Sequence, residues 1–355
     1  MRRTVIAAFL LLSLAPVSIL AQEAARPGAA TGAQPDLAAQ VRQLSQSLRS
    51  EGQRTDQVQK EVDDLMWHVR LQDIAEVDKI SIAASKPIRM PNPTGQGAGN
   101  PLIIYGYTFV PNKLGASQKA PMVVLVHGGV HASFDTSFAY VHIVRELVEQ
   151  GYIVVAPDYR GSTGYGREYY DQIDYGGAEI DDTHDIRNWA AQNLPHVDAE
   201  RVGIMGWSHG GYHTLLNIFR WPKDYKVAYA GCPVSDLVMR MGYKAQGYRD
   251  TFAAVTGGKQ AEDNPMEYRK RSPYFYADKL DTPLLIHSNT NDEDVNVMEV
   301  EHLIDSLKAN GKQSLFESKI YQNAPGGHHF NRLDTPLARQ SRQEIYAFLA
   351  KYLKP

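Results

Sequence analysis

A short glycine-rich motif constrains the fold of this chain more than any other feature. Residues 206–210 read Gly-Trp-Ser-His-Gly, a G-x-S-x-G pattern that follows the apolar run 202–205. A serine on a tight turn between a strand and a helix is exposed for attack, and glycines beside it avoid the clashes that such a turn creates. The motif therefore predicts a strand, a sharp turn that carries Ser208, and a helix that begins with Gly210 and Gly211.

Short apolar runs alternate with helical stretches after residue 101. The run Met-Val-Val-Leu-Val at 122–126 is typical of a strand that is buried on both faces of a parallel sheet. Strands are predicted at 102–110, 122–126, 152–156, 202–205, 227–232, 283–287 and 315–321, and helices at 138–150, 181–193, 210–220, 297–310 and 338–352. Alternating strands and helices imply crossover connections. We therefore predict an α/β fold of the α/β-hydrolase type, with a mostly parallel central sheet flanked by helices.

Two segments interrupt this alternation. Residues 77–101 turn to Pro, Gly and Asn, which predicts a connector, and residues 236–272 have the length and polarity of a lid-like insertion. We assign residues 77–355 to one catalytic domain that contains this insertion.

A serine hydroxyl is a weak nucleophile, so it needs a base, and the base needs a group that orients it. In α/β-hydrolases these partners follow the serine in the order acid, then histidine, each on a loop after a strand. The loop after the predicted strand 283–287 offers three acids, Asp292, Glu293 and Asp294, and the loop after the last strand offers His328 and His329. Only one of the two adjacent histidines can reach Ser208.

Backbone amides near the serine are predicted to stabilise a developing oxyanion. The amide of His209 follows the nucleophile directly and lies at the start of a helix. Gly128 and Gly129 come immediately after the predicted strand 122–126, where backbone without side chains can approach a substrate closely. We expect the second oxyanion donor to be one of these two glycine amides.

Extended motifs identify a family resemblance from about Tyr105 onward. The motifs are Val-His-Gly-Gly, Asp158-Tyr-Arg-Gly-Ser-Thr-Gly-Tyr-Gly166, Gly206-Trp-Ser-His-Gly-Gly-Tyr212, the loop Asn291-Asp-Glu-Asp-Val295 and Gly327-His-His-Phe330. Together they resemble the catalytic domain of prolyl oligopeptidase-type serine peptidases, a family that also includes acylaminoacyl- and dipeptidyl-peptidases. The resemblance implies that Ser208 is the nucleophile, Asp292 the acid and His328 the base. It also assigns an oxyanion donor to the His209 amide.

The chain departs from that family in several places. Members usually carry a β-propeller before the catalytic domain, whereas the eighty or so residues between the predicted signal and the first strand look helical here. His127 stands where many members place a tyrosine oxyanion donor, and Asp294 stands where members often have Arg or Asn to contact a peptide carbonyl. An ionised Asp294 cannot donate a hydrogen bond. No paired-Glu motif of dipeptidyl-peptidases is evident, so prolyl or dipeptidyl specificity does not follow from the resemblance.

The first residues are typical of an export signal. Arg2 and Arg3 precede an apolar run at 5–14, and Ile-Leu-Ala before Gln22 resembles a cleavage site. The run is about half the length that a membrane span needs, so we expect a signal peptide at 1–21 and no stable membrane insertion. A periplasmic or secreted protein is the resulting prediction. A linker rich in Ala, Gly, Gln and Pro follows at 22–34.

A heptad pattern occupies the remainder of the segment 22–76. Apolar residues on alternating four-residue and three-residue steps form a seam: Leu37, Val41, Leu44, Leu48, Val58, Val62, Leu65 and Val69. Glu51 and Thr55 continue the register with polar side chains, and Gly52 predicts a break or bend. The helix must bury this seam by docking on its own domain, by folding back as a hairpin, or by pairing with a second copy as a homo-oligomer.

Composition limits which partners and cofactors can be expected for this chain. The formal net charge of -3 gives no reason to expect nucleic acid, and the twelve histidines show no HExxH spacing. The single cysteine, Cys232, is expected to be a packing residue, so we predict no metal and no other cofactor. Trp207 and Tyr212 beside the serine, together with Asp294, are weak candidates for substrate contact.

These features predict a serine hydrolase that works through an acyl-enzyme. The leading hypothesis is a peptidase that cleaves peptide or acyl-peptide bonds. The alternative is a carboxylesterase acting on small or carbohydrate-linked esters, which would use the same catalytic residues. A third hypothesis, a binding module that uses the heptad segment, requires an inactive site.

Overall fold

The computed structural model describes residues 36–90 and 92–355. The chain divides into two units, one that ends at Ser47 and one from Leu48 to Pro355. The predictions of a signal peptide at 1–21 and of a linker at 22–34 lie outside the described residues. Within those residues, no helix has both the length and the apolar character that crossing a membrane would require.

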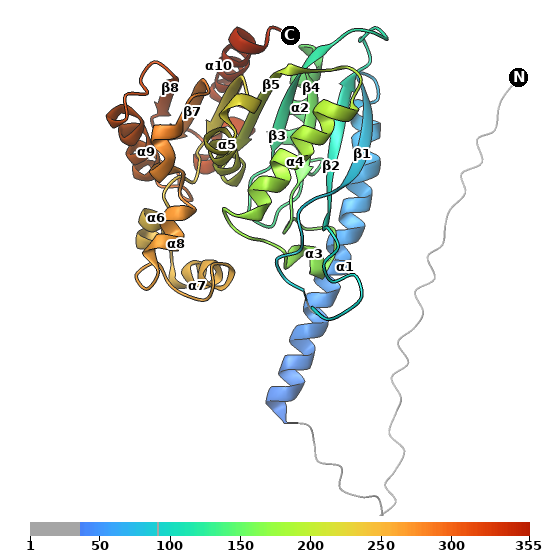
Figure 1. The fold of residues 1–355 in the computed structure, drawn as a ribbon, viewed down its shortest axis with the longest axis vertical. Helices are drawn as coiled ribbons and strands as arrows, with labels where there is room; N and C mark the ends of the chain where they lie inside the picture. Colours follow the sequence, from blue (N-terminus) through green and yellow to red (C-terminus); the bar gives the residue numbers. More distant parts are fainter. Residues whose placement is uncertain (1–35, 91) are drawn as a thin grey trace, which may run out of the picture. The chain divides into compact units, whose positions relative to one another are not determined.

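An eight-stranded sheet forms the centre of the described chain, with strand order β1-β2-β4-β3-β5-β6-β7-β8 (Figure 1). The strands are β1 (Ala75–Ala83), β2 (Ile103–Pro111), β3 (Ala120–Val126), β4 (Ile153–Asp158), β5 (Val197–Trp207), β6 (Val227–Gly231), β7 (Leu284–Asn289) and β8 (Phe316–Tyr321). β2 pairs antiparallel with β1 and β4, and all other neighbours pair parallel. The predicted α/β fold with a mostly parallel sheet is confirmed.

Helices cover both faces of the sheet (Figure 1). The α-helices of the described residues are α1 (Leu37–Leu71), α2 (Phe138–Glu149), α3 (Arg167–Tyr170), α4 (Ala178–Asn193), α5 (His209–Arg220), α6 (Leu237–Tyr243), α7 (Gln246–Val255), α8 (Pro265–Lys270), α9 (Val297–Ala309) and α10 (Pro336–Leu353). Successive side chains along a strand point to opposite faces of the sheet, so one strand contributes residues to two hydrophobic cores. Val124 belongs to the core that includes α4, α5 and α9, whereas Val123 belongs to the core that includes α1, α2 and α10.

Two local predictions are wrong. The connector predicted from residue 77 is the edge strand β1 as far as Ala83, where buried Val77, Ile80 and Ile82 are separated mostly by exposed polar residues. A half-exposed edge strand needs fewer apolar residues than a central strand, so its pattern is weaker. The break predicted at Gly52 is absent, because α1 continues through it and a side chain there would meet nothing within 4 Å.

α1 packs through a face that the heptad pattern did not predict. The buried residues of this helix are Lys60, Asp63, Trp67 and Leu71, and the Trp67 ring stacks on Phe134 at a centroid distance of 5.0 Å. The predicted seam lies elsewhere on the helix and is solvent-exposed. The exposed fractions are 65% for Leu48, 61% for Val58, 47% for Val62, 68% for Leu65 and 62% for Val69. These five seam residues therefore remain solvent-exposed within the described part of residues 48–355.

Candidate active site

Ser208 lies on a strained turn between β5 and α5. Its backbone has φ 60° and ψ -119°, a left-handed conformation that a non-glycine residue adopts only when its surroundings enforce it. A Cβ at Gly206 would lie 2.3 Å from the Gly210 carbonyl carbon, and a Cβ at Gly210 would lie 2.2 Å from the Val126 carbonyl oxygen. Both glycines are therefore required, and the turn presents Ser208 at the carboxyl end of the sheet as the motif predicts.

Asp292 and His328 meet as the family resemblance implies. Nδ1 of His328 lies 2.9 and 2.8 Å from the two carboxylate oxygens of Asp292. The carboxylate also accepts hydrogen bonds from the amides of Asp294 and Val295, at 2.9 and 2.8 Å. Burial by itself raises the pKa of Asp292, but the hydrogen bond and charge of His328 outweigh it and lower the pKa below its usual value. The carboxylate is thus held in place to orient the imidazole.

One pocket of about 370 Å³ joins the predicted nucleophile and base. Ser208, His328, Gly128 and Gly129 all line it, together with Glu293, Asp294, His329 and Arg332. Among the described residues, Ser208 Oγ and His328 Nε2 share no hydrogen bond, a contact that often tightens only with substrate bound. Nε2 instead faces Asp294 Oδ2 at 3.7 Å.

The predicted oxyanion donors differ in availability. The amide of Gly128 donates to the Tyr140 hydroxyl at 3.0 Å, so it is engaged within the protein. The glycine is nevertheless needed there, because a Cβ would lie 2.8 Å from the Trp207 carbonyl oxygen. The amides of Gly129 and His209 are the better candidates to bind a developing oxyanion.

Two residues that we considered as weak substrate contacts lie in the core instead. Trp207 is 5% exposed, and its indole nitrogen donates to the His328 carbonyl oxygen at 2.8 Å. Tyr212 is fully buried, and its hydroxyl donates to the Arg271 carbonyl oxygen at 2.6 Å. Neither side chain lines the Ser208 pocket. Trp207 supports the histidine loop, a role that motif spacing alone does not reveal.

Lys60 of α1 is a residue that sequence reasoning missed. Its ammonium lies 2.5 Å from Asp158 Oδ2 and donates to the Phe134 carbonyl oxygen at 2.8 Å, and both charged side chains are almost completely buried. Asp158 also accepts from the Phe134 amide at 2.6 Å and faces His127 Nε2 at 3.5 Å. Because His127 precedes Gly128, this ion pair braces the segment that carries the candidate oxyanion glycines.

Arg240 of α6 is the second residue that sequence reasoning missed. Its side chain is 3% exposed and contacts the carbonyl oxygen and Oδ1 of Asp294, at 3.2 and 3.3 Å. It also donates to the hydroxyls of Tyr243 and Tyr248, at 2.9 and 3.0 Å. The predicted insertion is therefore tied to the loop that carries Asp292 and Asp294.

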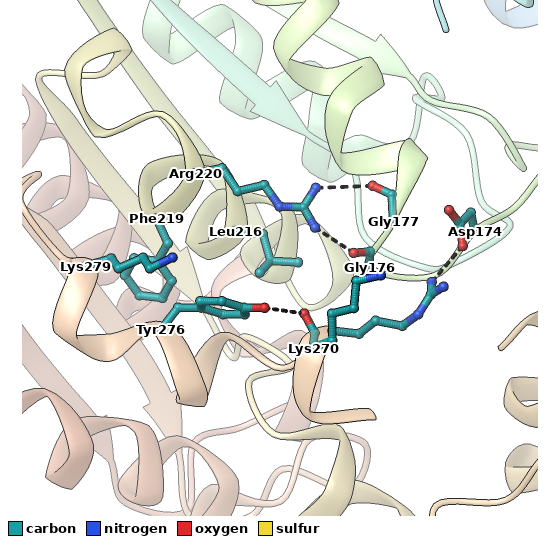
Figure 2. Close-up of a pocket in the computed structure, with 10 residues that line it drawn as sticks. Asp174, Gly176, Gly177, Leu216, Phe219, Arg220, Lys270, Tyr276 and Lys279 are labelled. Atoms are coloured by element: carbon teal, nitrogen blue, oxygen red, sulfur yellow. Dashed lines mark hydrogen bonds and ion pairs between the residues drawn. The ribbon is translucent and has the colours of Figure 1, made fainter. Parts of the chain in front are cut away.

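A separate cavity of about 510 Å³ lies beside α5 (Figure 2). Figure 2 shows the Arg220 guanidinium directed at the carbonyl oxygens of Gly176 and Gly177, which it contacts at 2.7 and 3.3 Å. Lys270 and Lys279 add positive charge to the lining. Ser208 does not line this cavity, so it is distinct from the candidate active site.

Two groups of side chains could hold a metal ion among the described residues. One consists of Cys232, Asp292 and His328 and overlaps the candidate triad, with Cys232 buried as a packing residue. The other consists of Glu179, His209 and His213, all of which are buried. The arrangement around Ser208 itself is suited to acyl transfer through a serine ester.

Comparison with protein families places these motifs in a known group. The model of the prolyl oligopeptidase family matches residues 136–355. The uncharacterized peptidase YuxL of Bacillus subtilis (strain 168) is 30% identical over 247 residues, which are 68% of this chain and 36% of that protein. The acylamino-acid-releasing enzyme of Mus musculus is 32% identical over 200 residues, covering 54% of this chain and 27% of that enzyme.

Solved structures show the same fold. The acylaminoacyl peptidase of Pyrococcus horikoshii superposes with a TM-score of 0.66 at 22% identity, over 81% of this chain and 43% of that one. A dipeptidyl peptidase 4 from Porphyromonas gingivalis superposes with a TM-score of 0.58 at 23% identity, over 79% of this chain and 36% of that one. This chain thus spans less than half the length of the relatives that it matches.

Proposed function

Because this chain belongs to the prolyl oligopeptidase family, we propose that it is a serine peptidase that cleaves peptide or acyl-peptide bonds through an acyl-enzyme. The observation that carries the proposal is the Asp292–His328 pair, in which the imidazole bound by Asp292 lines the same pocket as Ser208. Ser208 attacks the scissile carbonyl while His328 accepts its proton and Asp292 stabilises the resulting imidazolium. The amides of His209 and Gly129 are placed to bind the oxyanion, and His328 then protonates the leaving amine.

The alternative is a carboxylesterase that acts on small or carbohydrate-linked esters. It is favoured by Asp294, which occupies the pocket rim as a carboxylate bound to Arg240 and Lys244. A carboxylate cannot donate to a peptide carbonyl, so binding of an extended peptide at this position gains no hydrogen bond from it. Ester hydrolysis needs less protonation of the leaving group and depends less on such contacts.

One experiment separates these functions. Turnover by the chain is measured on matched peptidyl amides and peptidyl esters and on simple acyl esters, with Ser208→Ala as the control. A peptidase should cleave the amide within about tenfold of the matched ester, and the substitution should abolish both rates. Hydrolysis of esters alone would establish the esterase. Activity that survives Ser208→Ala would contradict both assignments.

We also propose that the chain is exported, on the basis of the signal-like sequence at 1–21. Expression of the full sequence followed by mass spectrometry of the exported fraction should find a mature amino terminus at Gln22. Retention of residues 1–21 on protein confined to the cytoplasm would contradict the proposal.

The exposed seam of α1 supports a homo-oligomer as the next proposal. The seam is formed mostly by Val and Leu side chains, and the buried Lys60 and Trp67 face away from it, so a second helix can pack there without displacing the first contact. Antiparallel pairing about residue 53 sets Leu48 against Val58 and Glu51 against Thr55. A parallel pair would instead set Glu51 against its own copy, which is repulsive.

Sedimentation measures this pairing directly. We expect a dimer at micromolar concentration for the unmodified chain and a monomer for Leu65→Glu, whereas Arg70→Glu, an exposed substitution outside the seam, should remain dimeric. A monomeric unmodified chain at all concentrations would overturn the proposal.

A further inference from the structure

Three side chains that can bind a metal, one glutamate and two histidines, converge close to the start of α5. Glu179 comes from the first turn of α4, and His209 and His213 are one helical turn apart on α5. One ligand atom from each residue lies within 4.8 Å of the others, and all three side chains are at least 98% buried. The i, i+4 spacing places both imidazoles on the same face of α5. The sequence showed no such site, because its acid and its histidines lie on separate helices.

The imidazoles in this cluster are short of hydrogen-bond partners. Within the described part of the chain, both ring nitrogens of His209 and Nε2 of His213 are buried without a partner. Buried polar nitrogens without partners are rare in folded proteins, because they lose their hydration and receive nothing in exchange. Because a neutral imidazole carries one available lone pair, one ring nitrogen of His209 and Nε2 of His213, beside a carboxylate, point to a bound species that accepts these two lone pairs.

Hydrogen bonds already orient two of the three side chains, His213 and Glu179. Nδ1 of His213 lies 2.9 Å from Thr183 Oγ1, which fixes the ring and leaves Nε2 directed inward. The Glu179 carboxylate accepts from the amides of Gly176 and Gly177. Figure 2 shows the carbonyl oxygens of the same two glycines, which accept hydrogen bonds from the Arg220 guanidinium. Metal-ligating histidines and carboxylates are characteristically oriented by outer hydrogen bonds of this kind.

The chemical types of the three side chains indicate which metal ions they would bind. Two imidazoles and one carboxylate suit Zn²⁺ and its first-row neighbours, whereas Mg²⁺ and Ca²⁺ prefer all-oxygen sites. Tetrahedral Zn²⁺ would place ligand atoms roughly 3.4 Å apart. His209 Nε2 lies 3.8 Å from Glu179 Oε1, and all three ligand atoms lie within 4.8 Å of one another, so they would have to approach by up to about 1.4 Å to close the site.

We propose that Glu179, His209 and His213 bind one divalent transition-metal ion, with Zn²⁺ as the first candidate. The three residues leave a fourth position for water. The ion would fix the side chain of His209, whose amide is a candidate oxyanion donor beside Ser208. Metal binding itself is independent of the proposed peptidase function, and only the effect on turnover rests on it.

Metal stoichiometry is the primary test. The full chain is stripped with chelator, dialysed against Zn²⁺ and measured by inductively coupled plasma mass spectrometry. We expect one equivalent for the unmodified chain and at least 100-fold weaker binding for His213→Gln and for Glu179→Gln. His184→Gln is the matched control on α4, because both His184 ring nitrogens are already hydrogen-bonded to Asp224 and Asn188. No stoichiometric Zn²⁺, or equal binding by His213→Gln, would overturn the proposal.

Co²⁺ spectroscopy distinguishes this site from the second cluster at Cys232, Asp292 and His328. Nitrogen and oxygen ligands give weak visible bands, whereas a thiolate adds an intense charge-transfer band in the near ultraviolet. We expect weak bands that persist in Cys232→Ser and disappear in His213→Gln. An intense band that Cys232→Ser removes would place the metal at the triad and overturn the proposal.

Stability provides a readout that does not depend on enzymatic turnover. Zn²⁺ should raise the melting temperature of the unmodified chain and of Ser208→Ala alike, because a ligand bound only by the folded state stabilises it. Glu179→Gln and His213→Gln are compared at matched folding, verified by circular dichroism in chelator. If one variant fails to fold, the other still decides the outcome. An inactive chain that binds one Zn²⁺ at this cluster would refute the peptidase while leaving the metal site intact.

Discussion

Two aspartate–histidine pairs lie close to Ser208, and they are used differently. In the Asp292–His328 pair, the carboxylate holds Nδ1 at 2.8 Å and the other side of the ring faces the pocket that Ser208 lines. In the Asp158–His127 pair, both side chains are fully buried and the ring nitrogen that faces Asp158 at 3.5 Å also contacts Ser162 at 3.1 Å. The same residue types thus occupy an accessible site and a sealed one.

The charge balance of the two carboxylates explains the difference. Burial by itself raises the pKa of Asp158, but the Lys60 ammonium and then His127 outweigh it, so the pKa lies below its usual value. Burial also lowers the pKa of His127. Lys60 therefore supplies the positive charge in the sealed pair, whereas in the accessible pair the base itself is available to take a proton from Ser208. His328 can serve as the base because one of its ring nitrogens faces the pocket that Ser208 lines, whereas His127 does not line that pocket.

The largest effect is expected from His328. His328→Gln should lower kcat/KM by about 10⁴-fold or more, because the acyl-transfer step loses its base, while the chain stays folded. The neighbouring His329→Gln should change kcat/KM by about tenfold or less. Steady-state kinetics on a peptidyl ester measures both, and a larger loss for His329→Gln would reverse the assignment of the base.

The orienting acid should show the next effect. Asp292→Asn is expected to lower kcat by roughly 10³- to 10⁴-fold, because an amide no longer holds the ring in its reactive tautomer or stabilises the imidazolium. Asp294→Asn removes the carboxylate that faces the other ring nitrogen at 3.7 Å, and kcat should fall by about tenfold or less. Equal losses for the two variants would show that the acid has been misassigned.

The sealed pair should affect stability more than the enzymatic rate. Lys60→Met leaves Asp158 buried without its counter-charge and should lower the free energy of unfolding by about 3–5 kcal/mol. Lys79→Met is the matched control, since Lys79 pairs with Asp64 at a part-exposed position where the loss should be about 1 kcal/mol or less. Urea unfolding measures both variants. A loss below about 1 kcal/mol for Lys60→Met would show that the pair is not stabilising.

The penalty for Lys60→Met should also depend on pH. In the unmodified chain the lowered pKa of Asp158 contributes stability above its unfolded pKa, and this is lost as the pH falls through the folded pKa. Without Lys60, burial becomes the main influence and should raise that pKa, so protonation of Asp158 relieves the penalty in acid. The difference between variant and unmodified chain should shrink by about 1–2 kcal/mol from about pH 8 to about pH 4.5. A difference that is constant across this range would contradict the assignment to Asp158.

Local pattern was sufficient to predict the elements that are regular and buried. Strand β3 is apolar at nearly every position, and strand β5 leads into the glycines that the Ser208 turn requires, so short stretches of sequence carry the signal. β1 was missed because an edge strand buries only alternate residues. The heptad seam was recognised correctly as a helical pattern, but pattern alone could not say which face of α1 would meet the domain.

What the sequence determined by itself was the turn chemistry, which depends on adjacent residues, and the order of the candidate catalytic groups, which follows from short motifs that are each local in the chain. Only the tertiary structure decided that Lys60 neutralises Asp158, that Tyr140 occupies the Gly128 amide, and that Trp207 holds the His328 loop. It also brought Glu179 to the two histidines of α5. Each of these contacts joins residues that are distant in the chain, and its free energy depends on how deeply the fold buries the paired groups, which a local sequence pattern does not encode.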